Sequence, residues 1–180
     1  YSFTTHYLPI NSFSPDGCHL RGVTYSDGSF LLYEFDLHGV EIQRSVALSK
    51  GVEDENKIYQ YSLSPSGRWL AYKVVDDIQM NVMGANVQNV RLLKVDDQIP
   101  QEVLQLTENG GAHPAALSWS PNSQYLAYTD YDEAGVGQIY VYDPDKSKEL
   151  QVTYFDQDMK EQIFENLVWS PDSSSIAFSM

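Results

Sequence analysis

The chain has 180 residues, of which 42% are apolar and 20% are charged. This length and composition suit a folded globular domain and exclude collagen-like, coiled-coil and disordered classes. Its 25 acidic and 11 basic side chains give a formal net charge of -14. A nucleic acid is not an expected partner, because phosphate binding requires a surplus of basic side chains.

The single cysteine, Cys18, has no second cysteine with which to form an internal disulfide. No apolar run reaches the roughly 18 residues that a membrane-spanning helix requires. We therefore expect no membrane insertion of this segment.

Four segments of the sequence share a motif built around a Ser-Pro pair. The pairs begin at Ser14, Ser64, Ser120 and Ser170, about 50 residues apart. An apolar or aromatic residue precedes each pair, and an aliphatic residue falls five positions after each proline. Proline presets a turn that Asp, Asn, Ser or Gly completes, so each copy is typical of a β-hairpin. Because the serine recurs in every copy, its hydroxyl is expected to bond within the turn and not to act as a nucleophile.

The repeats predict four units in chain order. The first, residues 11–58, has its third strand at 30–36 and its fourth at 41–48. In the second, 59–114, these strands fall at 90–96 and 102–106. In the third, 115–164, they fall at 138–143 and 149–154. The fourth unit, 165–180, is incomplete, with two strands.

Four short antiparallel strands that recur in this way, with no helical periodicity between them, are typical of a β-propeller blade. The sequence therefore predicts an all-β fold, a single partial propeller over residues 1–180. Because propellers close with about four to eight blades, we expect a fragment of a larger propeller. Trp69, Trp119 and Trp169 alternate with other residues along the strands, so they are expected to pack between blades.

An insertion at residues 76–88 distinguishes the second unit from the others. It contains Met80 and Met83, whose thioethers adapt to varied partners. Two alternatives remain open: a projecting hairpin that binds a partner, or an extended strand pair that folds back on its own blade.

The sequences Trp-Ser-Pro-Asn-Ser at 119–123, Trp-Ser-Pro-Asp-Ser at 169–173 and Ile-Tyr-Val-Tyr-Asp at 139–143 resemble the TolB-like β-propeller repeat. Similar repeats occur in periplasmic TolB, in sensor domains of membrane-bound ToxR-like regulators, and in the substrate-gating propellers of prolyl-oligopeptidase and dipeptidyl-peptidase enzymes. The resemblance implies a non-catalytic protein-binding or sensing module in the periplasm or elsewhere outside the cytoplasm. The gating propeller of a serine peptidase and the periplasmic sensor of a transcriptional regulator remain alternatives.

Strand polarity places the loops between second and third strands, and the loops between blades, on one face of a propeller. These loops carry most of the acidic side chains, which favours a basic protein or peptide as partner. The alternative is a solvated surface that keeps the chain soluble. With the two methionines, the candidate partner-binding residues are Glu53, Asp54, Glu55, Asp76, Asp77, Met80, Met83, Glu108, Asp130, Asp132, Glu133, Asp156 and Asp158.

Motifs for catalysis and for cofactors are missing from the sequence. There is no Gly-x-Ser-x-Gly elbow, no His-Glu-x-x-His and no glycine-rich phosphate loop. Asp130, Asp132 and Glu133 supply oxygens of the kind that calcium prefers, but their spacing lacks the glycine of a calcium loop. We expect no catalytic residue, no cofactor and no metal.

Overall fold

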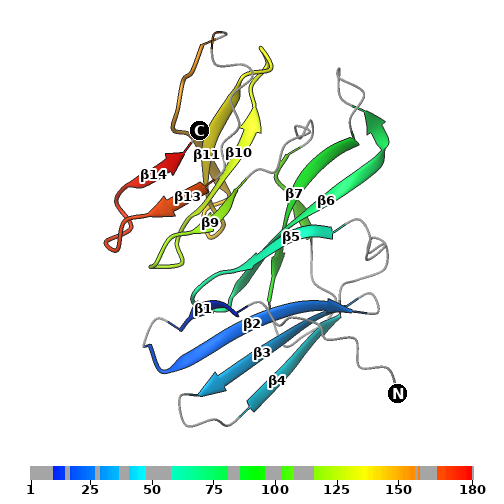
Figure 1. Ribbon diagram of the computed structural model, residues 1–180, viewed down its shortest axis with the longest axis vertical. Coiled ribbons are helices and arrows are strands. Elements are labelled where there is room, and N and C mark those ends of the chain that lie inside the picture. Colours follow the sequence, from blue (N-terminus) through cyan, green and yellow to red (C-terminus); the bar gives the residue numbers. More distant parts are fainter. Residues whose placement is uncertain are drawn as a thin grey trace.

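The computed structural model describes residues 10–14, 17–26, 29–36, 41–47, 58–80, 86–95, 103–107, 116–156, 158 and 166–179. Within these residues the elements are all β-strands, and they form separate antiparallel sheets that follow one another along the chain (Figure 1). None of the described residues belongs to a helix with the length and apolarity needed to cross a bilayer.

Three sheets have four strands, each paired with its neighbours in chain order. The first contains β1 (Ile10–Phe13), β2 (His19–Ser26), β3 (Ser29–Asp36) and β4 (Glu41–Ala47). The second contains β5 (Ile58–Leu63), β6 (Trp69–Met80), β7 (Asn86–Lys94) and β8 (Val103–Gln105). The third contains β9 (Leu117–Trp119), β10 (Leu126–Tyr131), β11 (Gly137–Asp143) and β12 (Lys148–Gln151). The pair β13 (Asn166–Trp169) and β14 (Ile176–Ser179) forms a fourth sheet.

The insertion at 76–88 lengthens the hairpin of the second sheet. β6 and β7 remain paired beyond the common blade length, with Asp76 opposite Val87 and Met80 opposite Asn86 across an irregularity in register. The described backbone of this segment is therefore an extended strand pair that continues β6 and β7.

The fourth strand of the third sheet is shorter than predicted, because it ends at Gln151 and not at Tyr154. Thr153 explains the difference. Its Oγ1 accepts the hydrogen bond from Ile139 N (2.8 Å), so a side chain replaces the backbone carbonyl of a regular ladder. The second sheet uses the same device, since Thr107 Oγ1 accepts from Val90 N (2.8 Å).

Each Ser-Pro corner is closed by the same three hydrogen bonds. At the second corner, Ser64 N donates to Trp69 O (2.8 Å), Gly67 N donates to Ser64 O (2.8 Å), and Trp69 N donates to Ser64 Oγ (3.1 Å). The other three corners repeat all three bonds. The predicted turn role of the recurring hydroxyl is therefore confirmed.

The fourth residue of each corner has a left-handed backbone. It is Gly17 or Gly67 in the first two corners (φ 69° and 74°), but Ser123 or Ser173 in the last two (φ 62° and 61°). A side chain costs about 1 kcal/mol in this conformation. Ser123 offsets that strain, because its Oγ accepts a hydrogen bond from Ser66 N of the preceding sheet (2.8 Å). Ser173 accepts the equivalent bond from the third sheet (3.1 Å).

Replacing Ser123 by alanine is expected to lower the free energy of unfolding by about 1 kcal/mol, because the bond between sheets is lost while the backbone strain stays. The glycine variant should lose less, because glycine adopts this backbone conformation freely. Urea unfolding followed by circular dichroism measures both. Equal stability of the alanine variant and the original chain would show that the bond contributes nothing.

Neighbouring sheets pack against one another through three apolar clusters, one for each interface. Trp119 and Trp169 hold the same position at successive interfaces. The indole Nε1 of Trp119 donates to Ser62 O, and that of Trp169 donates to Ser118 O, both over 3.0 Å. Trp69 packs at the edge of the second cluster. The prediction that these aromatic residues pack between blades is confirmed.

The first interface replaces the tryptophan with a different arrangement. Leu63 stands at that position, and Arg21 supplies the polar contacts by donating to Pro65 O and by pairing with Glu34 (2.6 Å). Gly67 allows this approach, because a Cβ there would lie 3.3 Å from Arg21 Nη1.

Candidate functional site

The two ends of a blade differ in chemistry. We call the end that carries the Ser-Pro corners the corner end, and the end that carries the loop 132–136 and the segment 152–158 the loop end.

The buried amide of Gln138 joins the two parts of the loop end. Its Nε2 donates to Asp132 Oδ2 and to Phe155 O, both over 2.9 Å, while its Oε1 accepts from Phe155 N (2.9 Å).

Asp132 organises the turn between β10 and β11. Its Oδ1 accepts from Ala134 N (3.0 Å) and Val136 N (2.9 Å), and its Oδ2 accepts from Gln138. Burial opposes ionisation here, but the hydrogen bonds from Val136 and Gln138 outweigh burial and lower the pKa of Asp132. Its carboxylate therefore has a structural role, and both oxygens already have donors.

Asp132→Ala is expected to lower the free energy of unfolding by about 1 to 3 kcal/mol, because three donors lose their acceptor. Asp132→Asn should restore only part of this, since its amide nitrogen would face the Gln138 nitrogen. The stability that Asp132 provides is present above its unfolded pKa and is lost as the pH falls through the lower folded pKa. Urea unfolding at neutral and acidic pH measures this effect.

Glu133→Ala is the matched control, because Glu133 is exposed on the same turn. It should change stability by no more than about 0.5 kcal/mol. A similar loss in the Glu133 and Asp132 variants would contradict the structural role of Asp132.

Asp130 lies on β10, one strand residue before the turn, and is partly buried. Tyr131 N donates to its Oδ1 (2.8 Å). Burial, to which the negative charge of Glu149 adds, raises the pKa of Asp130 to about 6. Glu149 also accepts a hydrogen bond from the buried Tyr128 hydroxyl. Asp130 is therefore partly buried and is less available to a partner than an exposed acid.

Exposed carboxylates at the loop end come from Glu133, Asp156 and Asp158. Asp156 Oδ1 accepts from Asp158 N (3.2 Å), which holds the two acids close together. None of the three forms an ion pair with another described residue. The described part of this loop end contains no lysine or arginine, so the exposed surface there is negative.

Basic side chains gather at the corner end and pair with acids there. Arg68 of the second sheet lies 3.2 Å from Asp145 of the third, and Lys146 lies 2.7 Å from Asp143. The charge is therefore polarised between the two ends of the third blade.

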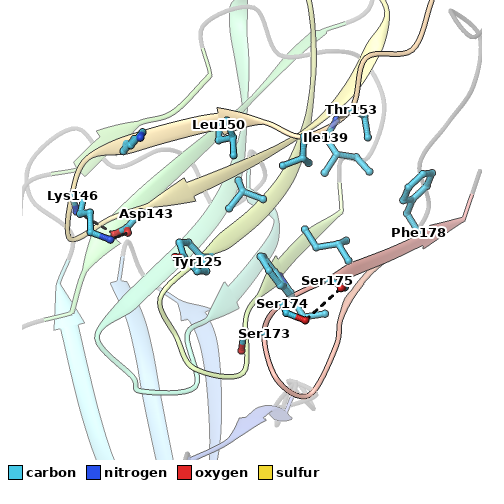
Figure 2. A pocket seen from close by; sticks show the side chains of 15 residues that line it. Tyr125, Ile139, Asp143, Lys146, Leu150, Thr153, Ser173, Ser174, Ser175 and Phe178 are labelled. Atoms are coloured by element: carbon cyan, nitrogen blue, oxygen red, sulfur yellow. Dashed lines mark hydrogen bonds and ion pairs between the residues drawn. The ribbon is translucent and has the colours of Figure 1, made fainter.

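A groove of about 700 Å³ lies between the third sheet and the pair β13–β14 (Figure 2). Ile139, Val141 and Leu150 of β11 and β12 form its apolar floor, and Ile176 and Phe178 of β14 form its opposite wall. Leu150 is 58% exposed and Phe178 is 39% exposed. Figure 2 shows Ile139, Leu150 and Phe178 around the same space, with the Asp143–Lys146 ion pair at the corner end.

Comparison with known proteins identifies the family. Residues 27–160 match the family model of the dipeptidyl peptidase IV (DPP IV) N-terminal region. The chain belongs to this family. No curated protein has a sequence that matches the chain.

Solved structures show the fold of this DPP IV N-terminal family member. It is similar to TolB from Acinetobacter baumannii, with a TM-score of 0.53 and 18% identity over 93% of this chain and 36% of that chain. It is also similar to a putative TolB from Agrobacterium tumefaciens, with a TM-score of 0.53 and 22% identity over 97% of this chain and 54% of that chain. The chain thus spans about a third to a half of these structures, and the predicted β-propeller fold is confirmed.

The candidate residues of the sequence lie in several environments in this family member. The structure brings Asp130, Asp132, Glu133, Asp156 and Asp158 to one loop end, and only the last three are exposed. Within the described residues, no group of three or more His, Cys, Asp or Glu side chains is placed to hold a metal ion.

The remaining candidates fall in the second unit or in loops. The strand β6 contains Asp76, Asp77 and Met80, whose backbone alone is described. Glu53, Asp54, Glu55, Met83 and Glu108 lie outside the described residues.

Sequence reasoning missed the groove, although its signal was present. Leu150 and Val152 alternate along the predicted fourth strand at 149–154, as Leu104 and Leu106 do along 102–106 in the second unit. This period-2 pattern indicates that one face of the blade is apolar and packs against another element.

Proposed function

We propose that this chain is a non-catalytic β-propeller module that binds a protein or peptide through the loop end of its blades. The proposed location is the periplasm or another compartment outside the cytoplasm, as the resemblance to TolB repeats implies. The observation that carries the proposal is the exposed negative surface of Glu133, Asp156 and Asp158, which is separated from the ion-paired basic groups at the corner end. Such a surface attracts a basic partner through electrostatic complementarity.

A labelled oligolysine peptide tests the electrostatic part of the proposal by fluorescence anisotropy at low and high salt. We expect binding that weakens as salt screens the charges. The double variant Glu133→Lys and Asp156→Lys should bind less, because it reverses the charge of exposed side chains that have no ion pair to lose.

Asp145→Lys is the control for the single variant Asp156→Lys, because each changes the net charge by two units at an exposed acid. Asp145 lies at the corner end, where its ion pair with Arg68 contributes little to stability. It should leave binding nearly unchanged. Equal weakening by the loop-end and corner-end variants, or no binding by any of the proteins, would contradict the proposal.

The family match favours a second candidate function, the gating propeller of a dipeptidyl-peptidase-like serine peptidase. In that case, the natural protein that contains this chain would also contain a hydrolase domain. Treatment of that natural protein with a labelled fluorophosphonate distinguishes the candidates, since an active serine nucleophile forms a covalent bond with the probe. Labelling supports the peptidase, and its absence supports the non-catalytic module.

A further inference from the structure

The interface between the first and second sheets departs from the repeat at two strand positions. Arg21 of β2 is opposite Glu34 of β3, and the two side chains form an ion pair (2.6 Å). The second sheet has Ala71 opposite Leu92 at these positions, and both are fully buried at the next interface. The third sheet likewise pairs a small residue with an aliphatic one. A charged pair therefore replaces apolar side chains at the first interface but not at the second.

Two positions at the second corner depart from the repeat at the same interface. Leu63 precedes this corner where Trp119 precedes the next one, so a smaller side chain packs against the first sheet. Gly67 takes the fourth corner position, where Ser123 has a hydroxyl that bonds to the preceding sheet. Both changes remove side-chain volume. The guanidinium of Arg21 fills part of that space, because its Nη1 lies 3.3 Å from the place of a Cβ on Gly67.

The space that remains is a cavity of about 90 Å³ at the corner end. Its lining consists of the four departures, Arg21, Glu34, Leu63 and Gly67, together with Leu32, Tyr33 and Ser66. The two charged side chains are largely buried, with 16% and 22% of their area exposed. Burial of an ion pair costs desolvation, and apolar residues commonly pack at least as stably. Since the second interface packs with apolar residues at these positions, packing alone does not account for the pair.

The ion pair leaves hydrogen-bonding groups unused beside the cavity. Arg21 donates from Nε to Glu34 Oε2 and from Nη1 to Pro65 O, and a guanidinium has more N–H donors than these two bonds use. Among the described residues, Arg21 Nη2 has no acceptor and Glu34 Oε1 has no donor. The pair therefore presents donors and an acceptor side by side.

Charge and size select the kind of ligand. Arg21 and Glu34 together have no net charge, so an anion would meet the carboxylate and a cation would meet the guanidinium. A neutral group that both accepts and donates satisfies the two side chains at once. A primary carboxamide has this pattern, with an oxygen that accepts and an NH₂ group that donates. A cavity of this volume has room for several water molecules, and therefore for a group of this size.

We propose that this cavity binds a primary carboxamide, whose oxygen accepts a hydrogen bond from Arg21 and whose nitrogen donates one to Glu34. The group is either a free small amide or the side chain of asparagine or glutamine on a partner polypeptide. The cavity lies at the corner end, apart from the exposed acids of the loop end, so this proposal does not depend on the proposed function.

A nuclear magnetic resonance titration with acetamide tests the proposal on the chain as it is. The reporters are the Arg21 Nε–H signal and the backbone amide of Gly67. We expect saturable shifts in the millimolar range, because so small a ligand provides little binding free energy. Acetate should bind about tenfold more weakly, because the carboxylate of Glu34 repels it. This comparison uses the unchanged chain, so it does not depend on the folding of any variant.

Glu34→Gln is expected to reverse the preference. It keeps the size of the side chain and leaves Arg21 as a cation without its acid, so acetate should bind better than acetamide. Asp145→Asn is the matched control, because it removes the same charge from the exposed ion pair with Arg68, outside the cavity. It should keep the preference for acetamide.

The peptide Gly-Gly-Gln-Gly-Gly distinguishes the two sources of the carboxamide. The same shifts at an equal or lower concentration than acetamide indicate a partner polypeptide, whereas shifts with acetamide alone indicate a free amide. Three outcomes would overturn the proposal. They are no saturable shift with acetamide, equal affinity of the unchanged chain for acetate and acetamide, and the same change of preference in the Glu34 and Asp145 variants.

Discussion

Trp119→Ala is expected to lower the free energy of unfolding by about 3 to 5 kcal/mol, because it leaves a large cavity between the second and third sheets. Trp119 is 8% exposed and belongs to the cluster that contains Leu92 and Leu126. Its removal also leaves Ser62 O without the indole donor that lies 3.0 Å away. The free energy of unfolding of a native domain is about 5 to 15 kcal/mol, so this loss would be a large share of it.

Urea unfolding followed by far-ultraviolet circular dichroism measures the effect without relying on tryptophan fluorescence. Trp119→Phe should recover most of the loss, because it keeps most of the apolar area and gives up the hydrogen bond. Trp169→Ala removes the equivalent side chain at an interface where it is only partly buried, so its loss should be smaller. Equal losses at Trp119 and Trp169 would show that burial at the interface does not control the effect.

Lys73→Met is expected to raise the free energy of unfolding at pH 7 by about 2 to 4 kcal/mol, because it removes a buried amine that costs desolvation. Lys73 is 2% exposed, and its Nζ has no hydrogen-bond partner. Burial lowers its pKa from 10.5 to about 7. The equivalent register position in the first sheet holds Val23, so an apolar side chain suits this place in the fold.

The pH dependence gives this prediction a second measurement. Between pH 7 and pH 10.5 the unfolded chain binds more protons at Lys73 than the folded chain, so stability should rise with pH. The Lys73→Met variant should lose this contribution. The exposed Lys148 provides the control, since Lys148→Met should change stability by no more than about 0.5 kcal/mol and keep the pH dependence. An unchanged slope in the Lys73 variant would contradict the assignment of the slope to this amine.

The fold could be predicted from the sequence where short-range chemistry decides the structure. The corner requires a side-chain acceptor, a fixed φ and a left-handed backbone position. These are supplied in turn by Ser64, Pro65 and Gly67. The same spacing places Trp119 and Trp169 one residue before their corners, which brings both to the interface with the preceding sheet. Strand ends were less predictable at Thr153, because its side chain replaces a backbone partner.

The candidate site could be predicted only as a region. Asp130, Asp132 and Glu133 are near neighbours in the sequence, yet Asp130 is partly buried near the charge of Glu149, Asp132 holds a turn and Glu133 is exposed. Strand polarity places all three acids at the loop end but does not distinguish them, because their roles depend on Gln138 and Glu149. These partners come from other strands.

The sequence by itself determined the corners, the strands and the order of the blades, since each depends on residues a few positions apart along the chain. Only the tertiary structure decided the burial of Lys73, the different roles of the three acids and the groove beside β14. The physical reason is that a side chain loses its contact with water when the neighbouring sheet packs against it. How closely that sheet packs at a given residue depends on the arrangement of the blades and not on the local sequence.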